Sequence, residues 1–127
     1  MSSFPIAVRI LLTVCFLGLL ALASLIPGHY EPGDSRFVWL AEQTPTLLQK
    51  TLHICLYAVL AFLLVWTLEY IESKTIRYLA SIVIAIAFGV LMEWGQTMVS
   101  GRFGGIVDVG LNSVGATLGL LIAIFVL

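Results

Sequence analysis

Residues 92–119 read MEWGQTMVSGRFGGIVDVGLNSVGATLG, and this stretch decides the fold because it joins two long apolar segments through a short polar connection. Its polar residues fall in or between segments that otherwise have the composition of membrane spans. Ionisable groups in hydrocarbon are energetically costly, so by default they mark functional positions. The stretch therefore predicts two consecutive membrane-spanning helices with a polar site near the turn between them.

The composition of the whole chain indicates a membrane protein. Of its 127 residues, 61% are apolar and only 10% are charged, whereas a soluble domain carries about 25% charged residues. The net charge of −1, without a basic tail, argues against nucleic acid as a partner. The sequence has no metal-ligand spacing of Cys or His and implies no cofactor. Cys15 and Cys55 lie in apolar runs and are expected to be buried, unpaired thiols.

Four apolar stretches have the length of about 20 residues that a membrane-spanning helix needs, and they cover residues 6–26, 50–70, 76–98 and 106–127. The connections after the second and third stretches are short, so neighbouring helices should be antiparallel. We predict an all-α integral membrane protein, a single domain over residues 1–127 whose four transmembrane helices pack as antiparallel hairpins. In the polar loop 27–49, residues 37–40 favour a short interfacial helix with Trp39 as its anchor.

Small residues at four-residue spacing predict close helix packing. Gly115 and Gly119 form a GxxxG pair, and Ser81, Ala85 and Gly89 form a similar row. In lipid, such rows allow the backbones of two helices to approach closely. Helix packing is the favoured interpretation of these residues, and the same rows leave a homo-oligomer open.

The polar residues of the spans should converge at one membrane surface, whichever way the protein is oriented. Each group occupies one stripe of its helix, at spacings of three, four or seven residues. The start of the second span, the end of the third and the start of the fourth lie at the same end of such a bundle. The predicted ligand-binding cluster comprises Lys50, His53, Tyr57, Glu93, Gln96, Arg102, Asp108 and Asn112.

The charged members of this cluster each have a functional and a structural interpretation. Glu93 has apolar neighbours, so its carboxyl group must pair, protonate or reach water. A functional role is favoured over a structural ion pair with Arg102 or Lys50. Arg102 suits the bidentate binding of a carboxylate or phosphate, and otherwise is an interfacial cation. Lys50 is either a ligand-binding cation or a cation at a helix end.

The remaining members carry hydrogen-bonding or proton-transfer groups. His53 is a candidate proton shuttle or a hydrogen-bonded interior histidine. Asp108 and Asn112 are candidate ligand-binding residues, with capping of the fourth span as the alternative. Tyr57 and Gln96 are expected to complete a hydrogen-bond network. The pattern does not single out a catalytic residue.

The opposite end of the bundle is expected to hold an ordinary solvated turn with flanking charges, namely Glu69, Glu72, Lys74 and Arg77. The basic residues divide equally between the two membrane sides, with Arg9, Lys74 and Arg77 on one and Arg36, Lys50 and Arg102 on the other. The N-terminal amine and the acidic first loop favour cytoplasmic N- and C-termini. The polar cluster would then lie at the outer surface.

Three blocks of residues together resemble the VanZ-like family of small bacterial membrane proteins. They are Ser24-Leu25-Ile26-Pro27-Gly28, Lys50-x-x-His53-x-x-x-Tyr57, and Glu93-x-x-Gln96 followed by Arg102, Asp108, Asn112 and Gly115. The chain departs from the family pattern at Gln49, Ile54 and Ser100-Gly101. The resemblance covers nearly the whole chain and implies a multi-pass protein of the bacterial inner membrane. The founding member of this family is associated with lowered sensitivity to teicoplanin-type glycopeptides.

Three functions fit these residues. The favoured one is a cell-envelope protein that binds or masks a lipid-linked or lipid-anchored anionic ligand, such as a cell-wall intermediate, and lowers teicoplanin sensitivity. The second is an intramembrane acid–base enzyme that uses His53 with Glu93 or Asp108 on a lipid-linked substrate. It is less favoured because no nucleophile stands beside them; Ser113 should point elsewhere on its helix. The third is a subunit of a small oligomeric transporter or flippase.

Overall fold

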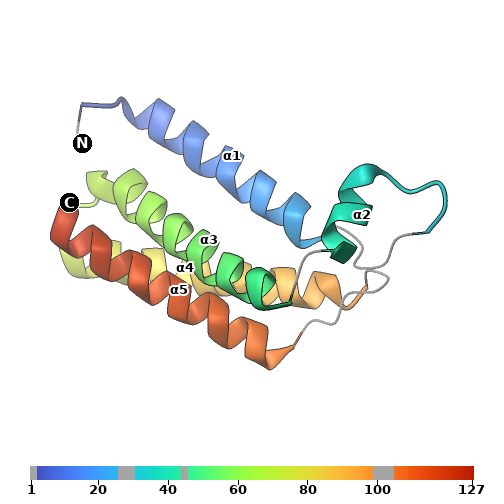
Figure 1. Cartoon of the computed structure of the whole chain (residues 1–127). Coiled ribbons are helices and arrows are strands. Elements are labelled where there is room, and N and C mark those ends of the chain that lie inside the picture. Colours follow the sequence, from blue (N-terminus) through green and yellow to red (C-terminus); the bar gives the residue numbers. More distant parts are fainter. Residues whose placement is uncertain (1–2, 26–30, 44–45, 99–104) are drawn as a thin grey trace.

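Four long apolar helices run alternately in opposite directions in the computed structural model of the chain, which describes residues 3–25, 31–43, 46–98 and 105–127 (Figure 1). They are α1 (Ile6–Ser24), α3 (Thr46–Thr67), α4 (Lys74–Gln96) and α5 (Ile106–Val126). Two short helices, α2 (Arg36–Gln43) and the 3-10 helix η1 (Leu68–Tyr70), complete the described elements. These residues contain no strand. The predicted all-α fold with four membrane-spanning helices is therefore confirmed.

Two helix starts differ from the sequence-based bounds. α3 begins at Thr46 rather than at residue 50, so Lys50 lies one turn inside the helix, where it is exposed. The sequence-based start was placed too late because the polar residues Gln49 and Lys50 interrupt the apolar run, although Leu47 and Leu48 already belong to the helix. α4 begins at Lys74 rather than at residue 76, because the Ser73 hydroxyl accepts a hydrogen bond from the Ile76 N–H at 3.3 Å.

The predicted short helix of the first loop is present as α2, which lies at the end of the bundle where α1 ends and α3 begins (Figure 1). Val38 is buried, whereas Phe37, Trp39 and Leu40 are exposed. A short helix that exposes aromatic and aliphatic side chains beside membrane spans has the composition of an element of the membrane–water interface.

α3 is the central helix of the bundle. It packs against α1, α4 and α5, and its contact with α5 is the most extensive. The buried core consists of residues from four helices: Leu20, Tyr57, Leu60, Ala61, Leu64, Ala85 and Ala116. Within the described residues, α1 contacts α3 and α4 but not α5. Helices α3, α4 and α5 therefore form a three-helix unit, and α1 lies against one side of it (Figure 1).

The glycine pair of α5 brings its backbone directly against α3 of the same chain. A Cβ atom at Gly115 would overlap the backbone carbonyl of Ile54, and one at Gly119 would overlap that of Ala58. The second row, Ser81, Ala85 and Gly89 of α4, is also buried within the bundle. Both rows are thus occupied inside one chain, and a homo-oligomer would need a different surface.

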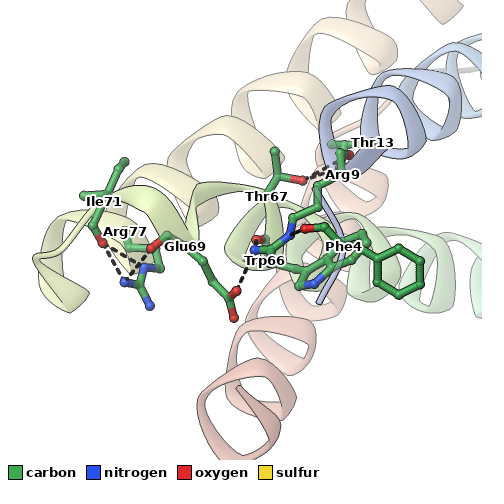
Figure 2. A network of polar contacts seen from close by, with 8 residues as sticks. All are labelled: Phe4, Arg9, Thr13, Trp66, Thr67, Glu69, Ile71 and Arg77. Carbon is green, nitrogen blue, oxygen red and sulfur yellow. Dashed lines mark hydrogen bonds and ion pairs between the residues drawn. The ribbon is translucent and has the colours of Figure 1, made fainter. Parts of the chain in front are cut away.

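A polar cluster joins α1 to α3 at the end of the bundle where both termini lie (Figures 1 and 2). We call it the Arg9 clamp; its residues are Phe4, Arg9, Thr13, Trp66, Thr67 and Glu69. Arg9 is only 7% exposed, and its Nη1 forms an ion pair with Glu69 Oε2 at 2.6 Å. The guanidinium group also donates to the carbonyl oxygens of Phe4 and Trp66, both at 3.0 Å. Its carbon lies 5.3 Å from the centre of the Trp66 ring, a cation–π contact.

The clamp continues one turn along α1. The hydroxyl groups of Thr13 and Thr67 share a hydrogen bond of 2.6 Å, and Thr67 also donates to the Arg9 carbonyl oxygen at 3.3 Å. Arg9, Thr13 and Thr67 are all buried, so the clamp places several satisfied polar groups inside the bundle.

The clamp corrects the expectation of a simple solvated turn at this end. Glu69 pairs with a buried arginine, and Arg77 donates to the carbonyl oxygens of Glu69 and Ile71 at 3.2 and 2.6 Å, which fixes the turn after η1 (Figure 2). Glu72 and Lys74 are exposed, as expected. The partner of Glu69 lies 60 residues away in the sequence, so local spacing could not reveal it.

The two cysteines are free thiols, but both are exposed rather than buried. The expectation was wrong because an apolar run does not distinguish the interior of a membrane bundle from its outward faces. Lipid is as apolar as the protein core, so hydrophobicity carries no information about which side of a span faces inward.

Candidate functional site

Seven of the eight residues predicted to form the ligand-binding cluster lie at the same end of α3, α4 and α5, opposite the Arg9 clamp. They are Lys50, His53, Tyr57, Glu93, Gln96, Asp108 and Asn112. His53 Nδ1 and Asn112 Oδ1 are 2.8 Å apart, which joins α3 to α5. The rings of His53 and Tyr57 are stacked, with an interplanar angle of 5° and centroids 6.5 Å apart.

Glu93 connects the end of α4 to the start of α5. Its Oε2 accepts a hydrogen bond from the backbone N–H of Gly105 at 3.2 Å. Its carboxyl group also interacts with the Asn112 side chain and, electrostatically, with His53, Asp108 and Tyr57. One carboxyl group therefore faces side chains from both other helices of the three-helix unit.

Gly89 makes room for this arrangement on the inner face of α4. A Cβ atom there would lie 3.2 Å from both Asn112 Nδ2 and Tyr57 Cε1. Any side chain at this position would therefore press on the two residues that α5 and α3 bring to the cluster. This contact was not identified from the sequence, where Gly89 was interpreted only as part of a small-residue row.

Four buried polar atoms in this region have no hydrogen-bond partner: Tyr57 Oη, Glu93 Oε1, Gln96 Nε2 and Asn112 Nδ2. Their residues are between 1% and 5% exposed. Most buried polar groups in folded proteins are paired, and leaving one unpaired costs about 1–3 kcal/mol. Four such atoms on three helices at one end of the bundle indicate a place that receives a ligand or ordered water. We refer to the residues that carry these atoms as the open cluster.

The two predicted cations stand apart from these contacts. Lys50 is exposed and forms no hydrogen bond or ion pair with the described residues. Arg102, and the aromatic Phe103 beside it, lie outside the residues that the structure describes. The structural alternative for Glu93, an ion pair with Lys50, is not formed, because Oε1 has no partner and Oε2 binds Gly105.

Asp108 and Asn112 do not cap α5. The N-cap residue is Gly105, whose extended backbone carries no side-chain cap. Asp108 lies in the first turn, where a negative charge complements the helix dipole, and Asn112 lies one turn further in. Ser113 donates its hydroxyl hydrogen to the Val109 carbonyl at 2.8 Å, so it is engaged with its own helix, as the sequence predicted. Within the described residues no group of His, Cys, Asp and Glu is arranged to hold a metal ion.

Comparison with known proteins identifies the family. A family model described as VanZ/LLP1 matches residues 13–127, which is nearly the whole chain. This match confirms the resemblance seen in the three sequence blocks. No curated protein and no solved structure matches the chain significantly.

Proposed function

The chain belongs to the VanZ/LLP1 family, and from this premise we propose that it binds the polar part of a lipid-linked or lipid-anchored ligand in the bacterial cell envelope. The ligand binds in the open cluster at the membrane surface. By binding or masking this ligand, the protein lowers the sensitivity of the cell to teicoplanin. The single observation that carries the proposal is the set of four buried polar atoms without partners on three helices.

The surroundings of the open cluster suit a ligand with both a lipid chain and a charged group. Trp39 and Trp94 are exposed, as an aromatic side chain at a lipid interface would be. Lys50, at the outer side of α3, offers a cation to a phosphate or carboxylate group. Arg102, between α4 and α5 in the sequence, offers a second one. An acylated glycopeptide that works at the membrane surface would meet the same region.

We place the protein in the cytoplasmic membrane of a bacterium, with both termini on the cytoplasmic side and the open cluster outside. Both termini lie at one end of the bundle, as an even number of spans requires (Figure 1). The acidic residues Glu31, Asp34 and Glu42 belong to the loop at the other end, which we assign to the outer side.

Drug susceptibility tests this proposal. A teicoplanin-sensitive Gram-positive host that expresses the chain should become less sensitive to teicoplanin and unchanged toward vancomycin. The variants Glu93→Gln, Asp108→Ala and Arg102→Ala, at matched membrane levels, should lose this protection. Lys74→Ala is the matched control, because Lys74 is an exposed cation at the opposite end of the bundle. Equal loss from Arg102→Ala and Lys74→Ala would contradict the assignment of function to one membrane surface.

A second candidate function, intramembrane acid–base catalysis, has one observation in its favour. The short contact between His53 Nδ1 and Asn112 Oδ1 fits a ring that donates from Nδ1 and keeps Nε2 free to accept a proton. Glu93→Gln distinguishes the two functions. It should abolish turnover of any lipid-linked substrate, whereas a binding site that keeps its shape would still bind its ligand measurably, although too weakly to protect against teicoplanin.

A further inference from the structure

We propose that the buried part of the open cluster recognises hydroxyl groups, as presented by the sugar or polyol headgroup of a lipid. This inference rests on the proposed function and names the ligand chemistry of the same site. It follows from the hydrogen-bonding capacity that the four side chains leave unused.

The unused groups call for both donors and acceptors, and the side chains of Tyr57 and Asn112 meet beside Gly89. Gln96 Nε2 and Asn112 Nδ2 each need an acceptor, and a carboxylate oxygen at Glu93 Oε1 needs a donor. Tyr57 Oη can serve in either role. A hydroxyl group both donates and accepts, so two or three neighbouring hydroxyls of one sugar ring would satisfy all four atoms. Turning either amide over exchanges its donor and acceptor, and a hydroxyl ligand satisfies the amide in both positions.

The alternative headgroup chemistries leave part of the open cluster unsatisfied. A phosphate would accept from the two amides, but it would bring negative charge beside Glu93, which already faces Asp108. An ammonium group would donate to Glu93, but it offers no acceptor to Gln96 or Asn112. The arginine and lysine side chains described at this end of the bundle, Arg36 of α2 and Lys50 of α3, are both exposed and therefore lie outside the buried cluster. An anionic part of the ligand therefore belongs at the rim, and the neutral polar part belongs inside.

Two substitutions remove a ligand contact without removing any hydrogen bond of the folded protein. Tyr57→Phe deletes a hydroxyl that has no partner, and Gln96→Met replaces an amide whose Nε2 has none. Tyr70→Phe is the matched control, because Tyr70 is 67% exposed at the opposite end. Both test variants should unfold at the wild-type temperature in the absence of ligand, which shows that they are folded.

The experiment measures the thermal unfolding midpoint of the protein in phosphatidylcholine nanodiscs as a second lipid is added. Nanodiscs are required because maltoside and glucoside detergents carry the hydroxyl groups under test. The added probes are glucosyl-diacylglycerol and phosphatidic acid with the same acyl chains, and methyl glucoside as a sugar without chains. A ligand that binds the native state raises the midpoint, and the rise gives an apparent dissociation constant.

We expect glucosyl-diacylglycerol to raise the midpoint, with an affinity about 3- to 10-fold weaker in Tyr57→Phe and in Gln96→Met, since each loses one hydrogen bond. Tyr70→Phe should bind like the wild type. Methyl glucoside should bind far more weakly than the lipid.

The other outcomes separate this inference from the proposed function. If phosphatidic acid binds and its affinity falls in Tyr57→Phe, while the glucosyl lipid does not bind, the hydroxyl inference is wrong and lipid binding stands. If methyl glucoside binds as tightly as the glucosyl lipid, the hydroxyl chemistry stands and a lipid-linked ligand is excluded. If none of the probes binds, both proposals fail, and ordered water is the occupant of the open cluster.

Discussion

The two ends of the bundle both bury polar side chains, but these side chains are fully hydrogen-bonded at one end and only partly at the other. In the Arg9 clamp, the guanidinium group has a carboxylate, two carbonyl oxygens and an aromatic ring as partners. In the open cluster, four buried atoms make no hydrogen bond of normal geometry. The helices are similarly apolar at both ends, so the free-energy cost of an unpaired buried polar group is similar at each end.

This difference distinguishes a structural network from one that we propose to be functional. A fully bonded polar network fixes the position of the helices that carry it, whereas a partly bonded one reduces stability and persists only where something else depends on it. The Arg9 clamp therefore accounts for how α1 is held on α3. The open cluster is where a ligand would supply the missing bonds.

The largest effect is expected from Gly119→Val, which acts on the contact between α5 and α3. The new side chain would overlap the Ala58 carbonyl, and relief requires the two helices to move apart, at a cost of about 3 kcal/mol or more in the free energy of unfolding. Because the Arg9 clamp does not involve α5, this variant should lose the open cluster and keep the clamp. A cysteine pair at positions 13 and 67, in a chain without the native cysteines, reports the clamp by oxidative crosslinking.

Gly110→Val is the control for this variant. Gly110 is a glycine on the same helix, and a Cβ atom there would meet nothing within 4 Å. It should unfold near the wild-type temperature. If Gly119→Val abolished the 13–67 crosslink as well, the two ends of the bundle would not be structurally independent.

Arg9→Met should have the next largest effect. It removes an ion pair and two hydrogen bonds, and it leaves Glu69 without its partner. Breaking a buried pair costs about 3–5 kcal/mol, and because the Glu69 side chain is 20% exposed we expect about 2–3 kcal/mol in the free energy of unfolding. Lipid affinity per folded molecule should not change. Lys74→Met, which removes an exposed cation at the same end, should have little effect on either quantity.

The double variant Arg9→Met/Glu69→Leu tests whether the loss of stability in Arg9→Met comes from the unpaired carboxylate of Glu69. Replacing both members of a buried pair by apolar residues often restores stability. Recovery of a large part of the loss is expected, as measured by reversible unfolding in lipid. No recovery would mean that the carbonyl contacts of Arg9, rather than the ion pair, hold α1 in place.

The sequence predicted the open cluster better than the Arg9 clamp, for a physical reason. His53, Glu93 and Asn112 stand near the ends of apolar spans, and alternating helices must bring those ends together. Arg9 and Glu69 also stand in or beside spans, but their pairing depends on which face of α1 turns toward α3. In a chain that is apolar on all sides, periodicity does not mark the inward face.

The same limitation explains what was missed within the site. The Gly105 N–H that binds Glu93 belongs to the backbone, and Gly89 contributes an absent side chain, so neither carries a chemical signal in the sequence. The starts of α1 and α5 were predicted at the observed residues. The starts of α3 and α4 were predicted four and two residues too late, because only the apolar runs were counted and Pro45 and Ser73, which precede these helices, were not used as start signals.

The smallest effect on stability is expected from Glu93→Gln. It contrasts most strongly with the large loss expected from Arg9→Met in the Arg9 clamp. The substitution keeps the shape of the side chain, and the amide oxygen can still accept from the Gly105 N–H. It removes a buried carboxyl group whose second oxygen has no partner and which faces Asp108. The free energy of unfolding should therefore stay the same or rise by up to about 1 kcal/mol, while protection against teicoplanin is lost. A loss of stability as large as that of Arg9→Met would show that Glu93 serves the fold in the same way as the clamp, and that the unpaired atoms do not mark a binding site.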